Sequence, residues 1–294
     1  MSPEKLIVST KGAGVTSNRG PVDELSSIQP CSHEEADTRI ILHLTAASYK
    51  AAMIRTVDTD VVVLAVAYCL PDRQLWVAFG AGVNYRLIPV HEIVKSLGPR
   101  VSQSLPMFHA LTGCDTVSSF HTIGKKKAWQ VWAVFPDITS SLIHLSAAPV
   151  TITEEHFHAI QRFVILTYDR GSSDTDVNSA RMHLFTKRSR QIESIPPTEA
   201  ALYQHVKRAV YQGGHIWGQA SQPAPKLPNP SDWGWMFHNG QWLPHWSNLP
   251  QASVACRELI KCGCRKGCKK RCKCVREGLD CTALCACDGQ CARD

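Results

Sequence analysis

Nine cysteines occupy thirty residues near the end of the chain, in the stretch CGCRKGCKKRCKCVREGLDCTALCACDGQC from Cys262 to Cys291. The spacing is C-x-C-x3-C-x3-C-x-C-x6-C-x3-C-x-C-x3-C. Structural zinc takes four thiolates in a tetrahedron, and nine thiolates satisfy three zinc ions when three of the sulfurs each bridge two ions. A disulfide knot is the alternative, but it is typical of exported chains, and the first residues here lack the pattern of a secretory signal. The spacing therefore predicts a cluster of three zinc ions.

Basic residues are interleaved with these cysteines. From Gln251 onward ten lysines and arginines stand against five acidic residues, a formal +5 of the chain's +7. Three zinc ions and nine thiolates would themselves carry a charge of about −3, so the local distribution of charge matters most. Seven cations in the first half of the stretch predict one basic face: Arg265, Lys266, Lys269, Lys270, Arg271, Lys273 and Arg276. Such a face binds phosphates in a salt-dependent way. A solvated charge run or a nuclear-localisation signal is the alternative.

This pattern resembles the tesmin-type CXC domain, a cysteine-rich nuclear module that binds DNA. The resemblance implies a location in the nucleus, DNA as partner, and DNA contacts by Lys269, Lys270, Arg271 and Lys273. It also implies the nine zinc ligands, which are Cys262, Cys264, Cys268, Cys272, Cys274, Cys281, Cys285, Cys287 and Cys291. Arg271 stands where that family has a tyrosine that reads the minor groove, and an arginine also suits a narrow, electronegative groove. Cys256 falls outside the pattern.

Acidic residues form a second candidate site, far upstream of the cysteines. Glu35 and Asp37 fall in the first turn of a predicted helix, HEEADTRIILHLTAAS, while Asp58 and Asp60 follow the predicted strand AAMIRTVD. Asp115 lies where an apolar helix gives way to a turn. Taken singly, each could be a helix cap or a turn residue. Together, at the strand ends of a parallel sheet, they predict a carboxylate pocket for magnesium or manganese.

The order of these motifs resembles the flap endonuclease group of the PIN-like nuclease fold. Glu-Ala-Asp on a helix is followed by Asp-x-Asp after a strand, by Gly-Cys-Asp, and then by HTIGKKKA. By that resemblance the five acids Glu35, Asp37, Asp58, Asp60 and Asp115 serve two-metal hydrolysis of a phosphodiester, and Gly124, Lys125 and Lys126 contact the phosphate backbone. The family's fold begins with a strand that ends in an aspartate. Residues 1–32 do not supply that strand, so we expect an incomplete, degenerate nuclease domain.

The surrounding pattern predicts an α/β fold, with a partial PIN-like parallel sheet and helices, plus a small cysteine-rich zinc module. Strands are expected at 51–58 and as a pair at 74–80 and 84–90, and a second apolar element begins after Asp60. Helical patterns follow at 91–98, 154–169 and 199–212. We divide the chain into an α/β domain at 1–214, a Pro/Trp-rich connector at 215–255 and the zinc module at 256–294. The tryptophans of the connector, Trp233, Trp235, Trp242 and Trp246, are expected to pack against a neighbouring surface.

Several function classes lack support in the sequence. No apolar run is long enough to cross a membrane, and no glycine-rich phosphate loop or Ser/His/Asp constellation is present, so neither a membrane nor a small-molecule cofactor is expected. Lone histidines such as His109 are expected to be structural. The sequence thus predicts a zinc-dependent DNA-binding protein with a nuclease-derived domain that is catalytically incomplete, of a kind found in mobile-element-derived genes. The alternatives are an active Mg/Mn-dependent nuclease and a chromatin scaffold whose zinc module contacts protein.

Overall fold

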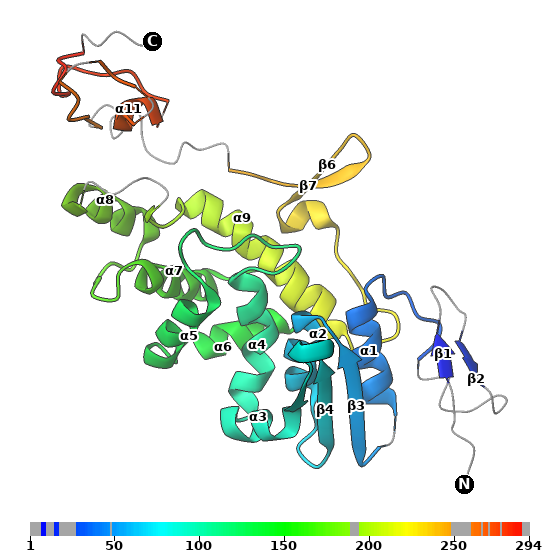
Figure 1. Cartoon of the computed structure of the whole chain (residues 1–294). Helices are drawn as coiled ribbons and strands as arrows, with labels where there is room; N and C mark the ends of the chain where they lie inside the picture. The colour runs from blue at the N-terminus through cyan, green and yellow to red at the C-terminus, as the bar shows by residue number, and fades with distance from the viewer. Residues whose placement is uncertain are drawn as a thin grey trace.

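A computed structural model describes residues 7–9, 15–17, 28–47, 49–188, 194–247, 260–265, 267–269, 271–276 and 278–289. It has a mixed α/β body and a cysteine-rich module near the C-terminus (Figure 1). The body combines a small sheet near one end with a larger group of helices. A short antiparallel pair, β1 (Ile7–Ser9) and β2 (Val15–Ser17), precedes it.

The sheet has three strands in the order β3-β4-β5. β3 (Ala51–Thr56) and β4 (Gln74–Phe79) are parallel, and the helix α2 (Thr59–Tyr68) connects them, as a parallel crossover requires. β5 (Arg86–Pro89) returns antiparallel to β4 after the short turn Gly82–Asn84. The predicted strand pair is confirmed. The expectation of a parallel sheet holds only for β3 and β4, because the link into β5 is too short for a crossover.

Eight further helices make up most of the described part of the body; in Figure 1 the first two of them lie beside the sheet and most of the others lie further from it. Their bounds are α1 Ala36–Ala46, α3 Val90–Leu97, α4 Pro99–Leu111, α5 Lys125–Val134, α6 Ile138–Ser146, α7 Glu154–Tyr168, α8 Val177–Arg188 and α9 Glu199–Val210. Thr153 and Thr198 begin α7 and α9, where each side-chain oxygen accepts a hydrogen bond from a backbone amide of the first turn. Among the described helices, none has the length and apolar character needed to cross a bilayer.

One hydrophobic core joins the sheet to the helices. Leu64 of α2, Leu75 of β4, Leu111 of α4 and Phe163 of α7 are all 0–1% exposed and belong to it. α4 lies at its centre, because it packs against α2, α6 and α9. This packing matters for the candidate sites, since α2 and α4 each carry residues that reach the acidic cluster described below.

The connector contributes both buried and exposed aromatic residues. After α9 the chain continues through a π-helical turn (Tyr211–Ile216) and two 3-10 turns (Trp217–Gln219 and Pro230–Trp233) into the hairpin of β6 (Trp235–His238) and β7 (Gln241–Pro244). Trp233 is 5% exposed and packs in the core, as expected of the connector tryptophans, but Trp242 and Trp246 are 44% and 63% exposed. The hairpin therefore carries aromatic side chains into solvent.

Candidate metal centres

Eight of the nine predicted zinc ligands lie among the described residues, and their sulfurs gather in one cluster. Three groups of four sulfurs have all their members within 4.8 Å of one another. The groups are Cys262/Cys264/Cys268/Cys272, Cys262/Cys274/Cys281/Cys285 and Cys262/Cys268/Cys281/Cys287. Four sulfurs at this separation match the tetrahedral ligand set of structural zinc. The prediction that this stretch could hold zinc is thus supported by geometry. Cys291 lies outside the described residues, as does Cys256.

Three sulfurs, those of Cys262, Cys268 and Cys281, belong to more than one of these groups. The Sγ atom of Cys262 lies 3.8 Å from those of Cys268 and Cys281, which are 3.5 Å apart from each other. These three therefore form a central triangle, with the other sulfurs outside it. A sulfur shared by two groups is placed to bridge two metal ions, and the expected three-ion cluster requires three such bridges. Within this module the longest regular element among the described residues is the four-residue helix α11 (Lys273–Arg276).

The crowded thiols perturb one another's ionisation. Burial opposes ionisation of Cys285, but hydrogen bonds from backbone amides and from neighbouring thiols lower the net pKa of this residue. Burial and the hydrogen bond to Cys285 raise the pKa of Cys274. Without metal, one thiol therefore keeps the proton that stabilises its neighbour's thiolate. Zinc binding displaces such protons, because the metal takes the thiolate form.

The cations of this module lie on its outside. Cys262, Cys268 and Cys272 are 5% exposed or less. The described cations between and around them are exposed or, for Lys273, half-buried: Lys261, Arg265, Lys269, Arg271, Lys273 and Arg276. The predicted contact residue Lys270 lies outside the described residues. Alternation of buried sulfur with exposed cation along the chain thus produces a positively charged surface over a sulfur interior.

The acidic motifs upstream also meet in space. Carboxylate oxygens of Asp37, Asp58 and Asp60 lie within 4.8 Å of one another. Asp37 is in the first turn of α1, and Asp58 is the N-cap of α2, where its Oδ1 accepts a hydrogen bond of 2.8 Å from the amide of Asp60. The hydroxyl of Thr56 in turn accepts a hydrogen bond of 2.9 Å from the amide of Asp58. Two helix starts therefore hold the three carboxylates together.

All five predicted acids belong to one electrostatic neighbourhood. Burial, followed by the charges of Asp58, Glu35, Asp60 and Asp115, raises the pKa of Asp37 to about 6. Burial likewise raises the pKa of Glu35, against the hydrogen bonds that its carboxylate accepts from Gln212 at 3.2 and 3.3 Å. Like charges held this close favour either a shared proton or a bound cation. Carboxylate oxygens are ligands that Mg²⁺ and Mn²⁺ prefer, so the triad could hold such an ion.

Sequence reasoning missed two partners of this cluster. His109, in the last turn of α4, places its Nε2 2.8 Å from Oδ1 of Asp60. Gln212 connects Glu35 to the loop after α4, since its Oε1 accepts a hydrogen bond of 3.0 Å from Thr116. The sequence around His109 or Gln212 gives no sign of a contact with the acids, because both residues lie far from those acids along the chain. His109 is buried, as a structural histidine would be, but it is also bonded to a site residue.

The basic motif that follows Asp115 is only partly directed outward. Gly124 is the N-cap of α5, and both it and Lys126 are exposed. The Lys125 ammonium turns back to donate hydrogen bonds to the carbonyl of His109 at 2.9 Å, to the Thr112 hydroxyl at 3.2 Å and to the carbonyl of Gly113. Burial of this ammonium lowers the pKa of Lys125 to about 8, although Cys114 and Asp60 oppose the change. Lys125 is exposed as a residue, but its ammonium thus caps the carbonyl groups at the end of α4.

The described residues contain two sets of metal ligands of different character. The C-terminal set is sulfur, which suits zinc, and the set at the starts of α1 and α2 is carboxylate, which suits magnesium or manganese. No protein-family model, curated protein or solved structure matches the chain. The chemistry of these two ligand sets is therefore the guide to function.

Proposed function

We propose that this chain is a zinc-dependent DNA-binding protein, whose C-terminal module contacts DNA and whose body derives from a nuclease domain. The observation that carries the proposal is the arrangement of the module, with sulfurs inside and cations outside. The cysteine spacing, similar to that of tesmin-type CXC domains, supports the same reading. DNA as partner agrees with a location in the nucleus and with an origin in a mobile element.

Zinc explains how so small a module could present a defined surface. A short basic peptide without a core pays a large entropic cost to hold its side chains in one arrangement. Metal binding supplies that folding free energy, as in zinc fingers. Lys269 and Arg271 flank the nearly buried Cys268 and Cys272 in sequence, so the metal that fixes the sulfurs also fixes the backbone from which these cations project. Their charges can then neutralise phosphates and release counterions.

The test is salt-dependent DNA binding by the full zinc-loaded chain. Fluorescence anisotropy with a labelled duplex should show affinity falling at least about tenfold between 50 and 200 mM salt, as several phosphate contacts imply. The double variant Lys269→Ala/Arg271→Ala should bind more weakly, with unchanged zinc content by elemental analysis. Lys95→Ala/Lys226→Ala is the matched control, because it removes two exposed lysines that lie outside the zinc module. Equal affinity of both double variants would instead favour a chromatin scaffold that contacts protein.

A second candidate, a metal-dependent nuclease of the flap-endonuclease kind, is favoured by the gathered acids. Asp37, Asp58 and Asp60 offer oxygen ligands at a separation that fits a divalent cation, with Glu35 and Asp115 nearby. Such an ion would supply Lewis-acid stabilisation of the charge on a phosphodiester. The chain's own residues hold the ligands in place, through the amide of Asp60 and the ring of His109.

The hydrogen bonds of the Lys125 ammonium to the end of α4 favour a domain that has kept the ligands but uses part of its phosphate-binding motif for structure. The nuclease assay uses branched and single-stranded DNA with Mg²⁺ or Mn²⁺. We expect no cleavage. We also expect the chain to bind Mn²⁺, and the double variant Asp58→Asn/Asp60→Asn to lose this binding. The control variant Asp72→Asn, which changes an exposed turn residue, should still bind Mn²⁺. Cleavage that the double variant abolishes would establish the active nuclease in place of the degenerate one.

A further inference from the structure

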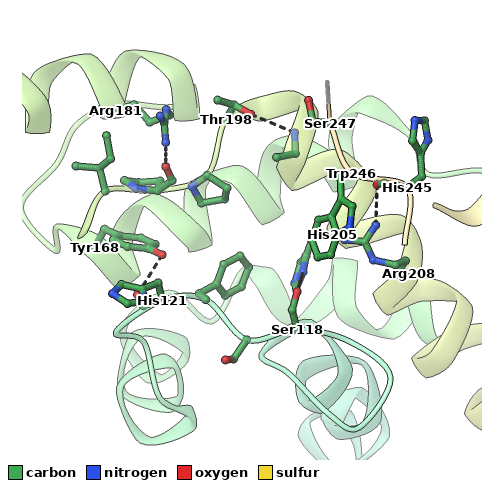
Figure 2. A pocket seen from close by; sticks show the side chains of 16 residues that line it. Ser118, His121, Tyr168, Arg181, Thr198, His205, Arg208, His245, Trp246 and Ser247 are labelled. Atoms are coloured by element: carbon green, nitrogen blue, oxygen red, sulfur yellow. Dashed lines mark hydrogen bonds between the residues drawn. The ribbon is translucent and has the colours of Figure 1, made fainter. Parts of the chain in front are cut away.

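A cavity of about 440 Å³ lies between α9 and the loop that follows α4 (Figure 2). Its walls come from five segments of the chain: the loop residues 118–121, Tyr168 of α7, Arg181 of α8, residues 195–208 at the start and along α9, and residues 245–247 after the hairpin. None of the five acids of the carboxylate site lines it. It is therefore a separate site, of a volume that small-molecule ligands occupy.

The cavity is positively charged. Arg181 and Arg208 line it, and none of its described lining residues is an aspartate or glutamate. Arg208 is 3% exposed, and its Nη1 donates hydrogen bonds of 3.1 Å to the carbonyls of Gly234 and His245. Burial lowers the pKa of Arg208. A guanidinium held by neutral carbonyls keeps its charge for an anion, which it can bind in a planar, bidentate way.

The same cavity is lined by aromatic rings. Phe120 and Tyr168 form part of its wall, and His205 packs its ring 4.6 Å from that of Phe120. Trp246 closes one side, with its ring 5.4 Å from Cζ of Arg208 and 63% of the residue exposed. In Figure 2 the rings of Tyr168, His205 and Trp246 lie around the same space as the two arginines. A large exposed indole beside a guanidinium is a surface on which a flat ring can stack.

We infer that this cavity binds a nucleotide, with the base stacked on the aromatic residues and the phosphate at Arg208. Only a ligand that is both flat and anionic uses both features of the lining. The hydroxyls of Ser118 and Thr198 on the cavity wall suit the polar sugar. The chemistry that this site recognises is the same in a free nucleotide and in the phosphorylated end of a nucleic acid strand. This site needs neither the zinc module nor the acidic cluster, so it goes beyond the proposed function.

The test titrates the full zinc-loaded chain, without Mg²⁺, with thymidine 5′-monophosphate, thymidine, inorganic phosphate and 5′-phosphorylated trithymidylate. Isothermal calorimetry should show the monophosphate binding at least about tenfold tighter than thymidine or phosphate alone. Trp246→Ala should weaken it at least about fivefold, since stacking of a base on an aromatic ring is lost. Trp242→Ala is the matched control, because this exposed tryptophan of the preceding hairpin does not line the cavity.

The remaining measurements distinguish a free nucleotide from a strand end as the ligand, and binding in this cavity from binding at the zinc module. Tighter binding of the trinucleotide than of the monophosphate identifies a strand end as the ligand, and equal binding identifies a free nucleotide. Lys269→Ala/Arg271→Ala should leave the monophosphate affinity unchanged, so failure of the zinc module to bind DNA does not affect this result. Four outcomes would overturn the inference: no saturable binding by about 1 mM, thymidine or phosphate binding as tightly as the nucleotide, Trp246→Ala binding like the wild type, or loss of binding in the Lys269/Arg271 variant.

Discussion

Replacing Asp37 by asparagine is expected to stabilise the metal-free protein at neutral pH. Asp37 is half-buried, and the charges of Asp58, Glu35, Asp60 and Asp115 add to burial in raising the pKa of its carboxyl from 3.8 to about 6. The folded chain therefore holds a carboxylate that would be more stable in the unfolded chain. Asparagine has a similar shape but no charge, so the substitution removes the repulsion and keeps the side chain in place.

The size of the effect follows from that pKa. A rise from 3.8 to about 6 corresponds to at most ~3 kcal/mol, at ~1.4 kcal/mol for each tenfold change in proton affinity. Solvent screens a half-exposed carboxyl, which brings the expected gain to about 1–2 kcal/mol. The sign depends on pH. Near pH 4 the folded carboxyl is protonated and the gain is close to zero, whereas between pH 4 and pH 7 the unfolded carboxyl ionises first and the gain grows to its full value.

Urea denaturation at fixed free zinc, repeated at pH 4.5, 6 and 7.5, measures this gain as the difference between wild type and variant at each pH. The difference cancels effects of acid on the zinc module that both proteins share. Asp72→Asn, in an exposed turn, is the control and should change little. At pH 7.5, millimolar Mn²⁺ should stabilise the wild type and not Asp37→Asn. A gain that does not vary with pH, or a loss of stability at pH 7.5, would refute the gathering of the acids.

Three further expectations concern other parts of the chain. Cys262→Ser should lose more zinc than Cys264→Ser in elemental analysis, because Cys262 belongs to all three sulfur groups and Cys264 to one; equal losses would contradict the shared-sulfur arrangement. His109→Ala should lower the free energy of unfolding by about 1.5–3 kcal/mol in urea denaturation, since the charged Asp60 loses a hydrogen-bond donor. Gly234→Ala should lower the free energy of unfolding by at least about 1–2 kcal/mol, because Gly234 has φ +80 and a Cβ there would lie 2.7 Å from the carbonyl oxygen of Gln204; an unchanged free energy of unfolding would refute this packing.

The local features of this protein follow from sequence alone. The sulfurs that meet in the C-terminal module are near one another in the chain, so their spacing predicts that they can share metal ions. The strands β3, β4 and β5 and the helices α1, α7 and α9 follow from hydrophobic periodicity, which is also local. The same holds for the positions of Asp58 and Asp60, because a strand followed by an Asp-x-Asp start of a helix is a local pattern.

Only the tertiary structure brings together what is far apart in the chain. Asp37 meets Asp58 and Asp60 because α1 packs against α2, and His109 reaches Asp60 because α4 packs against α2. The hydrogen bond from Lys125 to His109 and the cavity lined by residues from 118 to 247 also depend on how separate segments of the chain pack. Periodicity specifies which face of an element is buried, but not which distant element covers it. The sequence by itself therefore determined the sulfur cluster and the elements, while the packing of helices decided the acidic cluster and the cavity.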